Sequence, residues 1–281
     1  MKKPFLKFTV LLITLCVSVT SLAQDFQGKA YYMSKTTMDL DQFGGREMTA
    51  DRKKQIEERM KSFLEKQYIL TFNKEESIYK EDEKLEAATG GGRGFGGFAS
   101  SFTGGPKYKN VKSKELLQDQ EFFGKQFLIK DDLKDLEWTM GSETKQIGNY
   151  TVFKATAVKP ITGFDFSNFR PRRGQDAEKE EEKEEEIKTV EVTAWYTMQI
   201  PINQGPDDYW GLPGLILEVN AGRTTILCTK ITMNSKDKDN IDKPEKGEVV
   251  TQKEYTEITT KKMEEFRNNR GRRGGGRGGR N

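Results

Sequence analysis

The sequence predicts a mainly β fold, in which a curved antiparallel sheet resembles half of a barrel and two helices cover one face or edge. About eight to ten short runs rich in β-branched and aromatic residues recur along the chain. Apart from residues 49–66, no helical pattern separates consecutive runs, which favours antiparallel pairing over βαβ units. Only two segments have the apolar period of an amphipathic helix. A closed barrel or a sandwich is the alternative architecture.

The amino terminus has the three parts of a cleavable secretory signal peptide. Lysines among residues 1–7 form a positive n-region, residues 8–19 are apolar, and Ser21 and Ala23 supply the small residues that a signal peptidase reads. The apolar run is roughly a dozen residues long, well short of the ~20 needed to span a bilayer as a helix. We therefore expect cleavage after Ala23 and a mature protein that works outside the cytoplasm.

Removal of residues 1–23 changes the charge balance and the cysteine count. The full chain holds 47 basic and 44 acidic residues, and three of the lysines but no acid lie in residues 1–23, so 44 of each remain. A mature chain with no formal net charge indicates neither nucleic acid nor a charged membrane surface as a partner. Cys16 leaves with the signal peptide, and Cys228 alone cannot form an intramolecular disulfide.

The β-rich runs follow one another along most of the chain. The run over residues 189–202 is the clearest, because its first half mixes β-branched and aromatic residues with polar ones and so suits a sheet with one face in water. Strands are expected within residues 29–33, 68–72, 76–79, 108–111, 126–129, 136–140, 150–155, 189–202, 215–219 and 224–232.

Two helices are expected, over residues 49–66 and from about 252 to 267. A capping-box pair, Thr251 and Glu254, marks the start of the second helix. We interpret both helices as cover for the sheet rather than as partner-binding elements. Their apolar stripes are Ile56, Met60, Phe63 and Leu64 in the first, and Tyr255, Ile258, Met263 and Phe266 in the second.

Three segments have compositions that do not favour a packed core. Residues 89–106 are glycine-rich with scattered phenylalanine, residues 170–186 pass from basic to densely acidic, and residues 268–281 are an arginine–glycine tail. We therefore expect one β-rich domain over residues 24–267 with two flexible insertions and a disordered tail. The tail resembles RNA-binding segments in composition, but the export signal argues against a nucleic-acid partner.

Few residues are available for catalysis. The sequence has no histidine, which removes Ser-His-Asp and Cys-His systems and His-ligated zinc. One mature cysteine also excludes cysteine-rich zinc and iron–sulfur sites, so no metal and no cofactor are expected. Cys228 lies in an apolar strand pattern and is interpreted as a buried, inert thiol. Carboxylates remain as a route to a hydrolase, with Asp207, Asp208 and Glu218 as candidates.

Residues 200–219 hold most of the specific information in the chain. Prolines at 201 and 206 restrict the backbone, glycines at 205, 211 and 214 permit positive φ, and two aromatic residues lie between the resulting turns. One interpretation is a structural plug, in which Tyr209, Trp210 and Leu212 fold over an open end of the sheet. The other is an aromatic clamp for a ligand or partner, built from the anchor residues that interfaces favour. The docking candidates are Trp195, Tyr196, Tyr209, Trp210, Gly211, Leu212, Pro213, Gly214, Leu215 and Ile216.

The same segment resembles a known family. Residues 211–216 read Gly-Leu-Pro-Gly-Leu-Ile, the signature of the GLPGLI family of exported Gram-negative proteins, and the resemblance covers most of residues 24–267. Val152 stands where relatives often carry a cysteine. Further similar positions are Trp138, Tyr150 and residues 145–147 and 154–155, which resemble the family's W…K.I..Y…KA stretch, and residues 194–206, which resemble its AWY…IPI..GP stretch.

The resemblance implies location and fold more than activity, because the family is largely uncharacterised and transfers no catalytic or ligand residues. Its members are often associated with outer-membrane TonB-dependent transporters by gene neighbourhood. We therefore expect a non-enzymatic accessory or binding protein that is periplasmic or outer-membrane associated. Its expected partner is an outer-membrane transporter or another envelope protein, with membrane association peripheral at most. A carrier of an apolar ligand such as a lipid, and a carboxylate-dependent hydrolase, are the alternatives.

Overall fold

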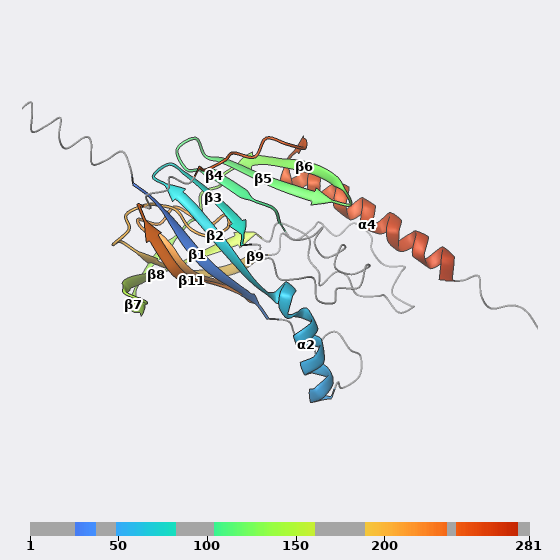
Figure 1. Ribbon diagram of the computed structural model, residues 1–281, viewed down its shortest axis with the longest axis horizontal. Coiled ribbons are helices and arrows are strands. Elements are labelled where there is room, and N and C mark those ends of the chain that lie inside the picture. Colours follow the sequence, from blue (N-terminus) through green and yellow to red (C-terminus); the bar gives the residue numbers. More distant parts are fainter. Residues whose placement is uncertain (1–25, 38–48, 83–103, 161–188, 235–239, 275–281) are drawn as a thin grey trace, which may run out of the picture.

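A computed structural model describes residues 26–37, 49–82, 104–160, 189–234 and 240–274. In these residues twelve strands form one open, mixed sheet that does not close into a barrel, accompanied by two helices (Figure 1). The predicted fold class is therefore confirmed. The predicted signal peptide, the insertion at 170–186 and most of the insertion at 89–106 lie outside the described residues.

The sheet consists of two meanders that share their first strand. In chain order the strands are β1 (Gln27–Thr36), β2 (Glu65–Asn73), β3 (Glu76–Glu81), β4 (Lys107–Asn110), β5 (Glu115–Phe122), β6 (Lys125–Asp132), β7 (Thr139–Ile147), β8 (Tyr150–Pro160), β9 (Thr189–Thr197), β10 (Leu215–Ala221), β11 (Thr224–Met233) and β12 (Glu248–Val250). β1 pairs with β2 on one side and β11 on the other, so β2 to β6 extend in one direction and β11 to β7 in the other. β12 pairs with β6 in parallel, whereas all the pairings among strands β1 through β11 are antiparallel.

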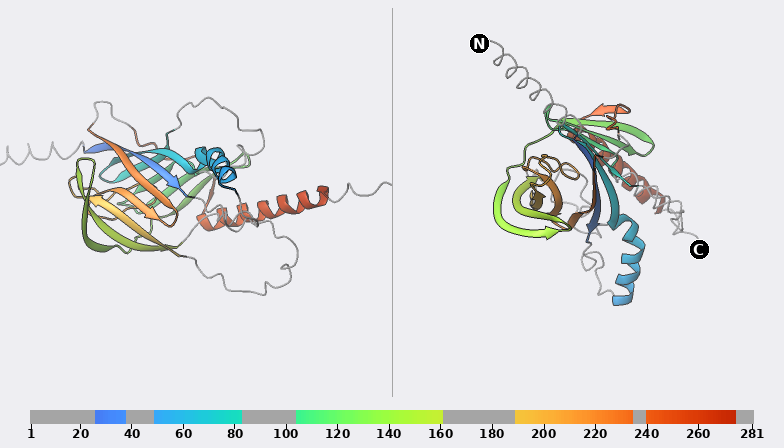
Figure 2. Two further views of the ribbon diagram at one scale, coloured as in Figure 1. Left: turned by 90° about the horizontal axis from the view of Figure 1, so that it is seen from below. Right: turned by 60° about the vertical axis from the view of Figure 1, so that its left-hand side comes forward.

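The sheet is strongly curved and therefore has a concave and a convex face. In the right-hand view of Figure 2, the yellow-green strands β7 and β8 curl around the loop that joins β9 to β10. Register shifts between Met140 and Thr144 in β7, and between Ile216 and Glu218 in β10, accompany this curvature. The curl brings β7 and β8 around to the concave side, opposite β1 and β2.

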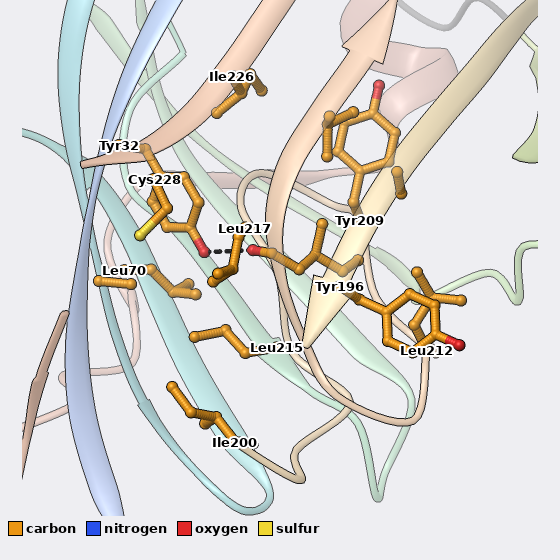
Figure 3. Close-up of a cluster of buried hydrophobic side chains, with 14 of the residues drawn as sticks. Tyr32, Leu70, Tyr196, Ile200, Tyr209, Leu212, Leu215, Leu217, Ile226 and Cys228 are labelled. Carbon is orange, nitrogen blue, oxygen red and sulfur yellow. Dashed lines mark hydrogen bonds between the residues drawn. The ribbon is translucent and has the colours of Figure 1, made fainter. Parts of the chain in front are cut away.

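The main core fills the concave face between β1, β2, β8 to β11 and the β9–β10 loop. Leu70 and Leu215 are fully buried in it (Figure 3). The Tyr32 hydroxyl donates a hydrogen bond of 2.6 Å to the carbonyl oxygen of Ile216, which ties β1 to β10. Cys228 lies in the same core, and burial raises the pKa of its thiol to about 12. Its interpretation as a buried thiol is confirmed.

The two helices contact the sheet at different places. Helix α2 (Ala50–Leu64) runs directly into β2 and projects from the end of β1 and β2 (Figure 1). Helix α4 (Gln252–Gly274) packs Tyr255 and Met263 against a small apolar cluster formed by β5, β6 and β12. No helix in the described part of the chain combines the length and the apolar character that a bilayer span requires.

The start of α4 forms the predicted capping box. The Thr251 backbone N–H donates to the Glu254 carboxylate at 2.7 Å, and the Glu254 N–H donates to the Thr251 hydroxyl at 3.2 Å. The Thr251 N–H and hydroxyl both hydrogen-bond the Glu254 carboxylate and lower its pKa, because they favour its charged form. The helix continues beyond its predicted end at residue 267 to Gly274, so its last turns lie within the predicted tail. Residues 275–281 of that tail lie outside the described residues.

Four strands differ from the sequence prediction. β5 was missed because its sequence, ELLQDQEF, is mostly charged or amide-bearing, although Leu117 and Phe122 are buried. β12 was missed because it is only three residues long. β7 begins at Thr139 and continues to Ile147, later than expected. β9 ends at Thr197, and the apolar residues that follow enter a loop instead of extending the strand.

Candidate functional site

Residues 198–214 join β9 to β10, fold back into the concave side of the sheet, and are called the plug loop below. Gly211 has a φ of +92°, a conformation that glycine adopts without strain, and its N–H donates to the carbonyl of Asn203 at 3.0 Å. Gly214 passes so close to β9 that a Cβ atom there would lie 2.1 Å from the carbonyl oxygen of Thr197. The glycines therefore allow a tight, inward-turned loop that no larger residue would permit at these two points.

The large apolar side chains of the plug loop face the interior, apart from the exposed Met198 at its start. Leu212 is 0% exposed, and the rings of Tyr209 and Trp210 are also buried. The Trp210 indole N–H donates to the carbonyl of Lys134 at 2.9 Å, and the Trp138 indole N–H donates to the carbonyl of Trp210 at 2.8 Å. These hydrogen bonds connect the loop to the segment between β6 and β7. The plug loop thus contributes to the core of the domain.

On the other side of the plug loop, β4 contributes a fully buried lysine. The ammonium group of Lys109 donates to the carbonyl oxygens of Gly205 and Tyr209, at 2.6 and 3.1 Å. Burial lowers the pKa of Lys109 to about 7, although Asp208 and Asp207 act in the opposite direction. Lys109 therefore satisfies two loop carbonyls that would otherwise be buried without a donor.

Two further lysines pair with the adjacent aspartates of the plug loop. Lys107, on β4, forms an ion pair with Asp207, and Lys159, near the end of β8, contacts Asp208 at 2.6 and 2.7 Å. Burial alone would raise the pKa of Asp208, but Lys159 and Lys107 outweigh it and hold the pKa at about 2. Burial alone would lower the pKa of Lys107, but the two aspartates raise it. The lysine–aspartate cluster, as we call it, consists of Lys107, Lys109, Lys159, Asp207 and Asp208.

Polar side chains of β2 and β3 border this cluster. The rings of Tyr68 and Tyr79 stack with centroids 4.7 Å apart, and burial together with nearby carboxylates raises the pKa of both hydroxyls. The Ser77 hydroxyl donates to the side-chain oxygen of Gln204 in the plug loop at 2.8 Å. Among the described residues, the Tyr79 hydroxyl and the Gln204 amide nitrogen have no hydrogen-bond partner. The plug loop thus has an apolar end at Leu212 and a polar end at the lysine–aspartate cluster.

Trp195 occupies a different position from the other predicted aromatic residues. Its neighbours on β9, Ala194 and Tyr196, are buried in the concave core, and strand alternation turns Trp195 to the opposite, convex face, where part of its ring still packs against residues of the main core. There its ring is partly exposed, and the ammonium group of Lys145 lies 4.2 Å from the ring centroid. Lys145 also pairs with Glu218 at 2.6 Å. The convex face therefore presents one indole ring held beside an ion pair.

The structure divides the predicted site residues into two groups. Trp195 lies on the convex face, and Gly211 and Pro213 lie in an exposed turn. The predicted carboxylates do not converge, because Glu218 pairs with Lys145 beside Trp195 whereas Asp207 and Asp208 pair with lysines on the concave side. The buried members are Tyr196, Tyr209, Trp210, Gly214, Leu215, Ile216 and Leu212.

The three lysines of the lysine–aspartate cluster were not predicted from the sequence. Lys107 and Lys109 lie in a short, polar strand, a pattern typical of a lysine face exposed to solvent. The available signal was the pair Asp207 and Asp208 in a loop expected to fold onto the sheet, since buried carboxylates need cationic partners. Within the described residues, no group of three or more histidine, cysteine, aspartate or glutamate residues could hold a metal ion.

Comparison with family models gives a match over part of this chain. Residues 138–218, which include β8, β9 and the plug loop, match a family model described as a protein of unknown function (Porph_ging). Among curated proteins, no sequence matches the chain.

Two solved structures of PNGF-II, in space groups C2 and P21, are similar to this chain at 15% sequence identity, with TM-scores of 0.42 and 0.41. Each comparison covers 76% of this chain, which spans 28% and 29% of the PNGF-II chains.

Proposed function

We propose that this chain is an exported, non-enzymatic binding protein of the GLPGLI family that docks onto a protein of the bacterial envelope. An outer-membrane transport system of the TonB-dependent type is the expected partner. The signal-peptide pattern of residues 1–23 and the GLPGLI signature of residues 211–216 support export and family membership. The docking surface that we propose is the convex face around Trp195.

The observation that carries this proposal is the contrast between the two faces of the sheet. On the concave side the protein's own plug loop occupies the interior, and Leu212 is completely buried there. On the convex side Trp195 is partly exposed beside Lys145 and Glu218. Tryptophan is among the residues that most often dominate binding energy in protein interfaces, especially when polar groups surround it.

The packed interior and the pKa of Asp208 disfavour the two alternative functions. A lipid carrier needs an apolar interior volume, but the side chains and backbone of the plug loop pack in the interior of the curved sheet. A hydrolase needs a carboxylate that can accept or donate a proton near neutral pH. Asp208 instead has its pKa held at about 2, with Lys159 and Lys107 outweighing burial, which makes it a poor general acid or base at neutral pH.

Site-specific photo-crosslinking in intact cells tests the proposal. A photoreactive amino acid replaces Leu227, which is exposed on β11 and pairs in register with Glu218. We expect a crosslink to one envelope protein, and we expect Trp195→Ala to reduce its yield at least tenfold because an interface anchor is lost. Val158→Ala removes an exposed apolar side chain from β8 and serves as the matched control with unchanged yield.

Thermal unfolding of the Trp195→Ala protein shows whether the sheet itself is intact. A crosslink that persists at full yield in a folded Trp195→Ala variant would contradict the convex-face site. Absence of any envelope crosslink from Leu227 and from neighbouring positions of β9 would contradict the docking function as a whole. Native mass spectrometry that finds a co-purified lipid would instead favour the carrier alternative.

A further inference from the structure

The turn between β5 and β6 carries a bulky aromatic residue in an unfavourable backbone conformation. Two residues, Phe123 and Gly124, join the strands, and their φ angles are +50° and +76°. Positive φ at both positions characterises a type I′ turn, in which Asn-Gly and Asp-Gly are strongly preferred. A large residue at the first position is a genuine outlier. The turn therefore does not explain why phenylalanine occupies position 123.

Phe123 forms part of an exposed aromatic pair. Its side chain is 45% exposed, that of Phe266 on α4 is 49% exposed, and the centroids of the two rings are 6.2 Å apart. Beneath them, buried Phe122 contacts Phe123 edge to face at 4.7 Å. We call Phe123 and Phe266 the aromatic tip. It stands on a packed base at the end of the β5–β6 hairpin.

Helix α4 changes in character at the aromatic tip. Met263, one turn before Phe266, is buried against the hairpin, whereas Phe266 lies where the helix leaves the sheet. Figure 1 shows α4 continuing away from the β5–β6 hairpin beyond this point. After Glu265 the chain has no acidic residue, and residues 267–281 contain six arginines. Exposed aromatic rings therefore lie directly before a strongly basic segment.

We propose that the aromatic tip and the basic end of α4 dock the protein on an anionic phospholipid bilayer. Phenylalanine rings insert at the boundary between head groups and acyl chains, and neighbouring arginines are attracted to anionic lipids. A second copy of the same chain suits this surface less well, because two arginine-rich segments would repel each other. The tip thus combines the two attractions that peripheral membrane proteins need.

This inference goes beyond the proposed function and does not depend on it. The aromatic tip belongs to the β5–β6 turn and α4, near one edge of the sheet, whereas Trp195 lies on β9 towards the other edge. Loss of vesicle binding through the tip and loss of crosslinking through Trp195 are therefore independent results.

Vesicle flotation tests the inference with the chain from residue 24 to 281, which contains every described element and lacks the apolar signal segment. The vesicles contain either phosphatidylcholine alone or an equal mixture with phosphatidylglycerol. We expect flotation with the anionic vesicles only, and weaker flotation at high salt because screening shortens the range of the arginine charges. Phe123→Asn combined with Phe266→Gln should weaken binding at least tenfold.

The substitution Phe123→Asn also separates binding from stability. Because asparagine is preferred at this turn position, the thermal midpoint should stay near that of the unaltered protein while vesicle binding falls. Val158→Thr removes a more exposed apolar side chain from β8 without lowering strand propensity, and should leave binding unchanged.

Several results would overturn the inference. The unaltered protein could fail to float with anionic vesicles, or it could float equally well with neutral ones. The double variant could also bind as strongly as the unaltered protein. An equal loss in the Val158→Thr protein would also overturn it, since binding would then be unspecific. Sedimentation that shows a dimer lost on Phe123→Asn would overturn it in favour of self-association.

Discussion

Replacing Lys109 by methionine tests the role assigned to the lysine–aspartate cluster. Methionine keeps the aliphatic stem and most of the volume, so little packing is lost. The carbonyl oxygens of Gly205 and Tyr209 lose their donor, at 2.6 and 3.1 Å in the unaltered protein. A buried polar group left without a partner costs about 1–3 kcal/mol. With both carbonyls affected, we expect a loss of about 4 kcal/mol at pH 9, where the amine is mostly neutral.

The same substitution should have a smaller effect at pH 6. Burial lowers the pKa of Lys109 from 10.5 to about 7, so between these values the unfolded chain binds more protons than the folded protein. Stability therefore rises with pH across this window and falls as pH drops through 7, by up to about 1.4 kcal/mol per pH unit. Methionine removes this dependence. We expect the variant to be only about 1 kcal/mol less stable than the unaltered protein at pH 6.

Urea unfolding at pH 6, 7, 8 and 9, followed by tryptophan fluorescence, measures both effects. Lys112→Met is the matched control, because Lys112 is 71% exposed in its side chain and pairs with Glu75 at the surface. Its removal should leave stability nearly unchanged at every pH, because an exposed ion pair contributes little. A Lys109→Met protein as stable as the unaltered one at pH 9 would refute the assignment of the two carbonyls. A stability difference between the two proteins that stays constant from pH 6 to pH 9 would refute the lowered pKa of Lys109.

Three further predictions concern the plug loop. Leu212→Ala should destabilise the protein by about 2–5 kcal/mol in urea unfolding, because a fully buried side chain is truncated, whereas Leu212→Met should cost less than about 1.5 kcal/mol. Gly214→Ala should lower the thermal midpoint severely, since its Cβ would collide with the Thr197 carbonyl, whereas Gly148→Asn, at a φ of +57° with open space around it, should have little effect. Asp208→Asn should make stability depend less on pH in the acid range. The pKa of Asp208 is about 2 in the folded protein and 3.8 ordinarily, so the carboxylate stabilises the fold above pH 3.8. About 2 kcal/mol of this stabilisation is lost as the pH falls to 2.

The antiparallel architecture could be predicted because runs of β-branched and aromatic residues predict strands directly. β9 shows this, since Val192, Ala194 and Tyr196 are all buried and alternate with less buried residues. β5 could not be recognised in the same way. Its buried apolar members, Leu117 and Phe122, are separated by amide and acidic residues, so the apolar period of the strand is hidden. Its identity as a strand depends on pairing with β4 and β6, which a local pattern does not contain.

The lysine–aspartate cluster was unpredictable for a similar reason. A lysine on a short polar strand is normally exposed, and its burial here depends on a loop that is distant in the sequence. The plug loop reaches Lys109 from almost one hundred positions further along the chain, as the separation of 96 residues between Lys109 and Gly205 shows. The loop was recognisable from its glycines and prolines, but the strand on which it would fold was not.

Backbone conformation and packing explain five of the six residues of the GLPGLI hexapeptide, all but the exposed Pro213, and this shifts attention to residues outside it. Gly211 needs a positive φ, Gly214 has no space for a Cβ atom, and Leu212, like the two residues after Gly214, is buried. These requirements concern the seating of the plug loop and involve no partner. Function is better sought where packing does not demand the residue that is present. Trp195 on the convex face is one such residue, and Phe123 is a stronger case, because its backbone conformation favours asparagine over the residue that the chain retains.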